Sequence, residues 1–126
     1  MNMKKNKILL SIKPEYVKSI TNGTKKYEYR KICAKKDVHS IIIYATTPIK
    51  RVVAEVEITD VLICPPSELW KKTKNQSGVT KDFFDLYFKN KKLAYAYKLG
   101  KVKKFSTPRE LKYYGVKLAP QSFIYL

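Results

Sequence analysis

The stretch from Val52 to Cys64 constrains the fold most, because its side chains alternate as in a strand with one buried face. The apolar positions are Val52, Ala54, Val56 and Ile58, and the polar positions between them include Glu55, Glu57 and Thr59. From Val61 to Cys64 the run becomes wholly apolar, which predicts a strand that enters the core. Pro65 and Pro66 then end it.

Five further segments are predicted to be strands, because they are short, carry β-branched or aromatic residues and are bounded by turn signals. They are Ile8–Ile12, Lys26–Arg30, Ile41–Tyr44, Leu93–Leu99 and Ser122–Leu126. Gly100 is expected to break the fourth of them, with residues 101–105 continuing it beyond a bulge.

Helix starts and stops are marked by capping residues and proline. Pro14 begins a first helix, and Asn22-Gly23 ends it, since both residues tolerate the left-handed conformation of a helix exit. Ser67 and Thr80 are expected to cap two more helices. The second of these carries an aromatic stripe predicted to pack in the core, namely Phe83, Phe84, Tyr87 and Phe88. Residues 107–110 fit a capping box, so a last short helix or turn is expected to run to Tyr114, before Gly115.

Strands outnumber helices, and no repeated β-α-β series is present. This pattern predicts an α+β fold, a small mixed β-barrel with short flanking helices, in preference to an open parallel sheet. At 126 residues the chain has room for one ordinary domain. We therefore expect a short basic N-terminal extension over residues 1–6 and a single domain over residues 7–126.

The charge of the chain constrains its partner. It has 27 basic and 10 acidic residues, a formal net charge of +17. A polyanion would offset the resulting self-repulsion, so RNA or a nucleotide-like ligand is expected. A basic surface that meets an acidic protein is an alternative that composition leaves open.

The sequence lacks the patterns expected of a secreted, a membrane-spanning or a zinc-binding protein. The run Ile8–Leu10 is too short for a signal-peptide core, and no stretch reaches bilayer length, so we expect no membrane partner and a cytoplasmic location. Cys33 and Cys64 stand far apart without a neighbouring histidine, so reduced thiols are expected. No metal and no cofactor are expected, and the isolated His39 is assigned no catalytic role.

The segment from Gly23 to Arg30 contains the pattern G-x-K-x-x-E-x-R at the junction of the first helix and second strand. Glu28 and Arg30 lie two residues apart on one strand face, so the carboxylate can orient the guanidinium. Lys25 lies at the turn, where its ammonium can reach the same opening. Arginine offers a planar fork to phosphate or a base edge, lysine a point charge, and glutamate an acceptor. The alternative interpretation is a structural salt bridge with a capping lysine.

Two residues at the end of the first strand, Ser11 and Lys13, are expected to line the same opening. The predicted ligand-binding residues are therefore Ser11, Lys13, Gly23, Lys25, Glu28 and Arg30. Single-stranded RNA sites also use aromatic stacking. Seven rings are candidates whose exposure the sequence leaves open: Tyr27, Tyr29, Trp70, Tyr95, Tyr97, Tyr113 and Tyr114.

The motif resembles that of the ASCH family, the activating-signal-cointegrator homology domains, whose members carry it at the same junction of a PUA-like β-barrel. The similarity extends to the strand-to-helix entry at residues 8–14, to Val53–Val56 and to the closing Pro120–Leu126. It implies a PUA-like fold and RNA binding, with a role in translation or its regulation.

An enzymatic alternative follows from the same resemblance. One ASCH-like branch consists of amidohydrolases of acylated cytidine nucleosides that use a lysine, a threonine and a glutamate. Lys25 matches the lysine, but Glu28 stands where the threonine nucleophile is expected, and residues 75–77 offer no carboxylate. A small hydrolase acting on RNA or a modified nucleoside stays open, with Lys25 and Glu28 as candidate catalytic residues.

Overall fold

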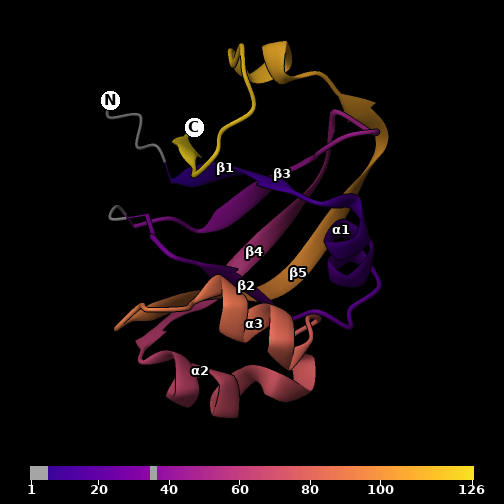
Figure 1. Ribbon diagram of the computed structural model, residues 1–126. Coiled ribbons are helices and arrows are strands. Elements are labelled where there is room, and N and C mark those ends of the chain that lie inside the picture. Colours follow the sequence, from indigo (N-terminus) through magenta and orange to yellow (C-terminus); the bar gives the residue numbers. More distant parts are fainter. Residues whose placement is uncertain (1–5, 35–36) are drawn as a thin grey trace.

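In the computed structural model, which describes residues 6–34 and 37–126, the strands form one curled sheet (Figure 1). Within those residues the sheet has six strands in the order β2-β5-β4-β3-β1-β6. Their bounds are β1 Lys7–Ile12, β2 Tyr27–Arg30, β3 Ser40–Ala45, β4 Arg51–Cys64, β5 Ala94–Arg109 and β6 Ile124–Tyr125. β1 and β3 pair in parallel, and the other described pairs are antiparallel. The predicted extension over residues 1–6 lies outside the described residues except for Asn6.

The two long strands, β4 and β5, determine the curvature. They have 14 and 16 residues, and their pairing changes register between Val52 and Ala54, between Val56 and Ile58, and between Ile58 and Asp60. Such irregularities bend and twist a strand pair. The sheet therefore curls into a half-barrel, and with its short helices it confirms the predicted α+β barrel-like class.

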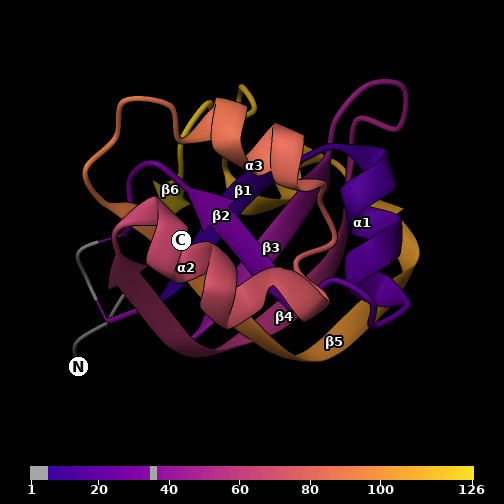
Figure 2. The ribbon, with the colours of Figure 1, turned by 60° about the horizontal axis from the view of Figure 1, so that its bottom comes forward.

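The helices of the described residues are short and gather at two places (Figures 1 and 2). α2 and α3 lie next to each other at one end of the sheet, and α1 lies at its side, where Tyr16 of α1 meets Phe83 of α3 with ring centroids 5.8 Å apart. Their bounds are α1 Pro14–Thr21, α2 Pro66–Thr73 and α3 Lys81–Tyr87, with 3-10 turns η1 at Lys74–Gln76 and η2 at Leu111–Tyr114. No helix among the described residues has the length and apolar character needed to cross a membrane.

Several predicted boundaries are confirmed. Pro14 opens α1, Asn22 is its C-cap, and Gly23 follows with a φ of 88°. Thr80 caps α3, where its hydroxyl oxygen accepts a hydrogen bond from the backbone N–H of Phe83 at 3.1 Å. These features depend on neighbouring residues, which explains why the local pattern predicts them.

Other boundaries were predicted wrongly. Ser67 lies inside α2, because Pro66 already begins the helix and Pro65 is its N-cap. The break predicted at Gly100 does not end the strand, since Gly100 lies within β5, where a Cβ would come 2.5 Å from the Glu57 carboxylate oxygen. The predicted bulge and the continuation over residues 101–105 are confirmed, because Val56 pairs with Val102 and Ile58 with Leu99. The start of the last short helix or turn was predicted too early, because β5 continues to Arg109, which pairs with Val52. Its predicted end is confirmed, since η2 runs over Leu111–Tyr114 with Gly115 as its C-cap.

The core consists of three clusters of buried side chains. One lies between the sheet and α1, a second lies under α2 and α3, and a third lies toward η2 and β6. The aromatic stripe of α3 is buried in part, since Phe84 and Phe88 are buried whereas Phe83 is 36% exposed. Ile63 is 55% exposed, so the apolar end of β4 does not enter the core along its whole length.

Phe84 is expected to contribute more to stability than any exposed residue of its helix. It is fully buried against Tyr29, Trp70 and Phe88, so Phe84→Ala should lower the free energy of unfolding by about 3–5 kcal/mol. Leu86→Ala is the matched control, because Leu86 is 72% exposed and should change stability by no more than about 0.5 kcal/mol. Urea denaturation measures both. Equal losses would contradict the assignment of Phe84 to the core.

Candidate functional site

A cavity of about 140 Å³ opens among the end of β1, α1, β2 and α3. We call it the motif cavity. Its lining residues are Ser11, Ile12, Lys13, Tyr16, Lys25, Glu28, Tyr29, Arg30, Val79, Phe83 and Tyr87. The wall is mainly aromatic and aliphatic, and three charged groups of the sequence motif face into it.

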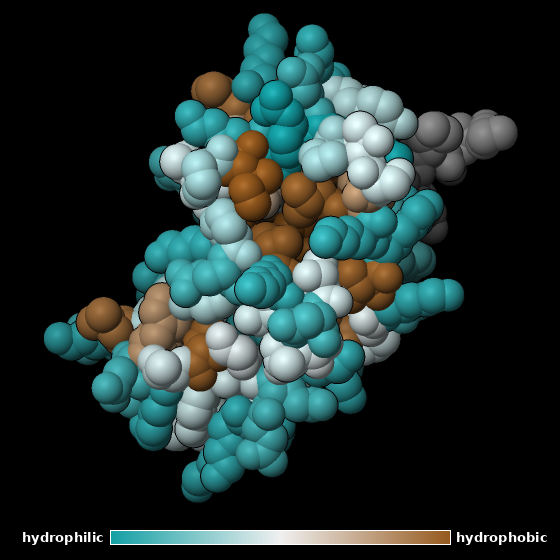
Figure 3. Space-filling model, turned by 90° about the vertical axis from the view of Figure 1, so that its right-hand side faces the viewer, coloured by the Kyte–Doolittle hydropathy of each residue, from teal (hydrophilic) through white to brown (hydrophobic). Residues whose placement is uncertain are grey.

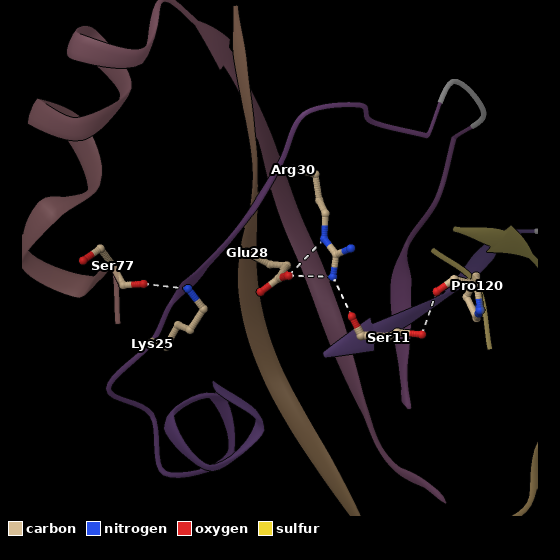
Figure 4. Close-up of polar contacts among 6 residues, drawn as sticks. All are labelled: Ser11, Lys25, Glu28, Arg30, Ser77 and Pro120. Carbon is tan, nitrogen blue, oxygen red and sulfur yellow. Dashed lines mark hydrogen bonds and ion pairs between the residues drawn. The ribbon is translucent and has the colours of Figure 1, made fainter. Parts of the chain in front are cut away.

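Glu28 and Arg30 form a closely held ion pair at the edge of β2 (Figure 4). The Arg30 guanidinium donates from Nε and Nη2 to Glu28 Oε2, at 3.0 and 2.8 Å. Nη2 also donates to the backbone carbonyl of Ser11 at 3.0 Å. β1 and β2 are not neighbours in the sheet, so Arg30 links two strands that backbone pairing leaves apart.

Lys25 is buried beside this pair, with 2% of its surface exposed. Its Nζ donates to the backbone carbonyl of Ser77 at 2.7 Å and lies over the rings of Tyr29 and Tyr16, 4.9 and 5.4 Å from their centroids. Burial lowers the pKa of Lys25, the Glu28 carboxylate opposes that change, and Arg30 lowers it further. The site therefore contains a lysine that gives up its proton more readily than a surface lysine does.

Tyr29 forms the floor beneath Lys25. Burial raises the pKa of Tyr29 to about 12, so its hydroxyl is protonated at neutral pH. The hydroxyl lies 2.6 Å from Thr73 Oγ1, which itself donates to the carbonyl of Leu69 at 2.8 Å. These bonds tie the floor of the cavity to α2.

Gly78 makes room for Lys25. It has a φ of 70°, and a Cβ at this position would lie 2.5 Å from Lys25 Cβ and Cγ. Gly78 follows four polar residues in the sequence, and a glycine in such a run does not reveal what packs on it. The role of Gly78 as the cover of the motif lysine emerges from the tertiary contact.

The structure places the predicted residues as follows. Lys13, Lys25, Glu28 and Arg30 line the motif cavity together with Ser11. The Ser11 hydroxyl donates to the carbonyl of Pro120 at 2.8 Å, so it fixes the C-terminal segment while its own carbonyl holds Arg30.

Gly23 does not line the cavity and serves to end α1. The sequence analysis missed the aromatic walls, Tyr16, Phe83 and Tyr87. Helical spacing pointed to Phe83 and Tyr87 but assigned them to the core. In the described residues no group of metal-ligating side chains is gathered.

Residues 10–111 match the ASCH domain family. The chain belongs to this family. The match spans the end of the first strand, the motif and the long strands, so the ASCH assignment covers the whole of the motif cavity except the contact to Pro120.

Solved structures show the same fold. The crystal structure of ASCH from Zymomonas mobilis has a TM-score of 0.89 and 23% identity, covering 98% of this chain and 89% of that one. The N-terminal domain of Staphylothermus marinus McrB has a TM-score of 0.51 and 13% identity, covering 90% of this chain and 82% of that one. At these identities the likeness concerns the fold alone.

Two relatives from Ureaplasma parvum are much longer than this ASCH domain. One, named large ribosomal subunit protein uL22, is 34% identical over 68% of this chain and 28% of its own length. Another, named ATP synthase subunit alpha, is 25% identical over 98% of this chain and 16% of its own length. The chain thus spans less than a third of the relatives that it matches.

Gly78→Ala should destabilise the domain more than Gly115→Ala. Both glycines have φ near 70°, so alanine costs about 1–2 kcal/mol at either position. A Cβ at Gly78 also overlaps Lys25, which adds about 1–3 kcal/mol, whereas a Cβ at Gly115 meets nothing within 4 Å. Thermal unfolding of the two variants measures the difference. Equal melting temperatures would show that Gly78 does not cover Lys25.

The stability of the domain should depend on pH through Lys25. Burial lowers the pKa of Lys25 in the folded state below the value of 10.5 that an exposed lysine has. As pH rises toward 10.5, the folded protein loses this proton before the unfolded chain does. The unfolded chain then holds more protons than the folded one, so the free energy of unfolding increases with pH in this range. The free energy of unfolding of the wild type should therefore rise relative to that of Lys25→Met between neutral pH and about 10. Denaturation at several pH values tests this. Parallel curves would mean that the pKa is not lowered.

Proposed function

We propose that this ASCH domain binds RNA and takes one unstacked base into the motif cavity. The observation that carries the proposal is the convergence of aromatic walls with an oriented Arg30–Glu28 pair in a chain of net charge +17. The volume of about 140 Å³ suits a single ring, since an apolar cavity of about 150 Å³ accepts benzene. Drug-sized ligands need about 300–1,000 Å³.

The polar groups of the cavity fit the edge of a base. A carboxylate has about four acceptor sites, so Glu28 can accept from an exocyclic amino group while Oε2 holds Arg30. The planar guanidinium of Arg30 is already fixed by Glu28 and the Ser11 carbonyl, which reduces the entropy lost on binding. Tyr16, Phe83 and Tyr87 offer ring surface for stacking.

A base can enter the cavity only when it leaves its stack, which favours single strands and loops over duplex RNA. The sugar-phosphate chain would then lie outside, near exposed cations such as Lys13 and Lys31. Hydrophilic residues predominate around an apolar patch on the face that carries α1 (Figure 3). Such a surface suits a solvated polyanion.

The proposal includes action in the cytoplasm, in translation or its regulation. Cys33 and Cys64 are free thiols, which suits a reducing compartment. A relative named as a ribosomal protein supports an RNA ligand. A segment similar to this chain also occurs in the relative named ATP synthase subunit alpha. The ribosomal name is therefore one of two names among these relatives.

Hydrolysis is the second candidate, and one observation favours it. The buried Lys25 has a lowered pKa next to the Glu28 carboxylate at the cavity, which is the environment of a residue that exchanges protons. Wild type and Lys25→Met, incubated with labelled RNA and with an acylated cytidine nucleoside, decide this point. Turnover that requires Lys25 would establish the hydrolase, and unchanged substrates would leave binding as the function.

The motif and the general charge should affect RNA binding differently. Arg30→Lys removes the planar fork and Glu28→Gln removes the acceptor charge, so each should weaken binding of the preferred RNA by about ten-fold. Glu28→Gln should leave non-specific affinity equal or slightly higher, because it deletes an acid among cations. Titration against homopolymeric single-stranded RNAs of each base, at two salt concentrations, measures these effects.

Lys71→Ala is the control for general charge, since Lys71 is exposed on α2 and does not line the cavity. It should weaken all RNAs alike and reduce the salt slope by at most about 0.7. Uniformly tighter binding by Glu28→Gln, with Arg30→Lys unchanged, would reduce the motif to a structural salt bridge. Circular dichroism checks that the Arg30 variant remains folded.

A further inference from the structure

A second cleft lies along the last part of β5, beside η2. It measures about 490 Å³ and is lined by Lys103, Lys104, Phe105, Ser106, Thr107, Arg109 and Tyr113. We call it the β5 cleft. As far as the described residues show, its lining contains three cations and no acid, and it shares no residue with the motif cavity. The cleft is thus a separate positive surface.

Arg109, which lines the β5 cleft, is held in place by its neighbours. Its guanidinium carbon lies 4.1 Å from the ring centroid of Phe105 and 4.7 Å from that of Tyr113. Its Nη1 donates to the Tyr114 hydroxyl at 2.9 Å. Stacking and hydrogen bonding therefore fix a planar cation before any ligand arrives, and they also fix η2 against the strand.

Tyr113 is the exposed ring of this arrangement. It is 67% exposed. The other six candidate rings named from the sequence, Tyr27, Tyr29, Trp70, Tyr95, Tyr97 and Tyr114, are buried or half-buried. An exposed ring that rests on a fixed arginine offers a stacking surface at little cost in side-chain entropy.

Two acids lie near the cleft, and each is paired with a cation outside it. Glu55 lies opposite Lys103 in the pairing of β4 with β5, but its Oε2 is 3.0 Å from Lys7 Nζ. Glu110 follows Arg109 in the chain, but its carboxylate pairs with Lys112 at 3.0 Å and lies 3.9 Å from Arg51. The cations that line the β5 cleft therefore remain available to a ligand. Lys103 and Lys104 are both exposed.

We propose that the β5 cleft is a second site for single-stranded RNA, in which a base stacks on Tyr113 and the cations Lys103, Lys104 and Arg109 face phosphates. Cationic grooves that contain an aromatic platform have the composition of single-strand sites, because every base has a ring face. In duplex RNA those ring faces are stacked on one another, so a duplex would bind only through the attraction between its phosphates and the cations. The inference shares its ligand class with the proposed function but depends on different residues.

Replacing Tyr113 tests the stacking. Tyr113→Leu keeps an apolar side chain but removes the ring, so it should weaken binding of a fluorescein-labelled oligouridylate by about ten-fold. Tyr113→Phe keeps the ring and should bind like wild type. Neither change should weaken binding of a blunt RNA duplex. Fluorescence anisotropy gives the affinities, and thermal melting verifies the fold of these exposed-site variants.

The contribution of the cleft lysines to RNA binding is measured separately, from the salt dependence of the affinity. The double variant Lys103→Ala with Lys104→Ala should reduce the single-strand salt slope by up to about 1.4, since each neutralised phosphate contributes about 0.7. The pair Lys91→Ala with Lys92→Ala removes equal charge from exposed positions outside the cleft and should reduce the slope less.

Three results with RNA would overturn the proposal. They are unchanged oligouridylate binding by Tyr113→Leu, equal loss in Tyr113→Phe and Tyr113→Leu, and equal slopes for the two lysine pairs. Because no lining residue is shared in the described structure, Arg30→Lys reports on the motif cavity while Tyr113→Leu reports on the β5 cleft. Each proposal can thus fail without the other. Tight binding of an acidic protein that depends on the lysines but not on Tyr113 would assign the cleft to a protein partner.

Discussion

The link from Arg30 to the Ser11 carbonyl joins two strands that the sheet itself keeps apart. β4 and β5 pair over most of their length, and their register shifts bend the sheet until the ends of β1 and β2 approach each other. Arg30 then spans the remaining gap, with Glu28 holding the guanidinium on the other side. The motif cavity lies against this link, so its shape depends on both the curvature and the ion pair.

This arrangement keeps excess positive charge on largely buried side chains. Lys25 and Arg30 bring two cations against the one carboxylate of Glu28. Burial of charge costs free energy unless polar partners compensate, and here the carbonyls of Ser77 and Ser11 and the ring of Tyr29 supply part of that compensation. An anionic or electron-rich ligand in the cavity would supply more, which connects the electrostatics of the fold to the proposed function.

The fold alone does not decide what the domain does. Proteins with this architecture at 13–23% identity share the curled sheet, and the longer relatives carry unrelated names. The function has to be argued from the aromatic walls and oriented cations of the motif cavity. The β5 cleft also combines cations with aromatic rings, but these lie on one strand and a turn.

The sequence by itself determined the features that neighbouring residues control. The alternation after Val52 specified a strand, Pro14 and Asn22 bounded α1, and the spacing of Glu28 and Arg30 placed both on one strand face. Local sterics and periodicity act over a few residues, and a linear pattern records them. The resemblance to the ASCH family rested on these same local elements.

Only the tertiary structure decided which distant residues meet. The contact of Gly78 with Lys25, the place of Phe83 in the cavity wall and the exposure of Tyr113 all depend on how the sheet curls. Pairing with Val52 likewise extended β5 to Arg109, against a local signal for a helix start. Helical spacing predicts that a ring lies on the apolar face of a helix, but whether that face meets core or solvent depends on bends and register shifts far away in the chain.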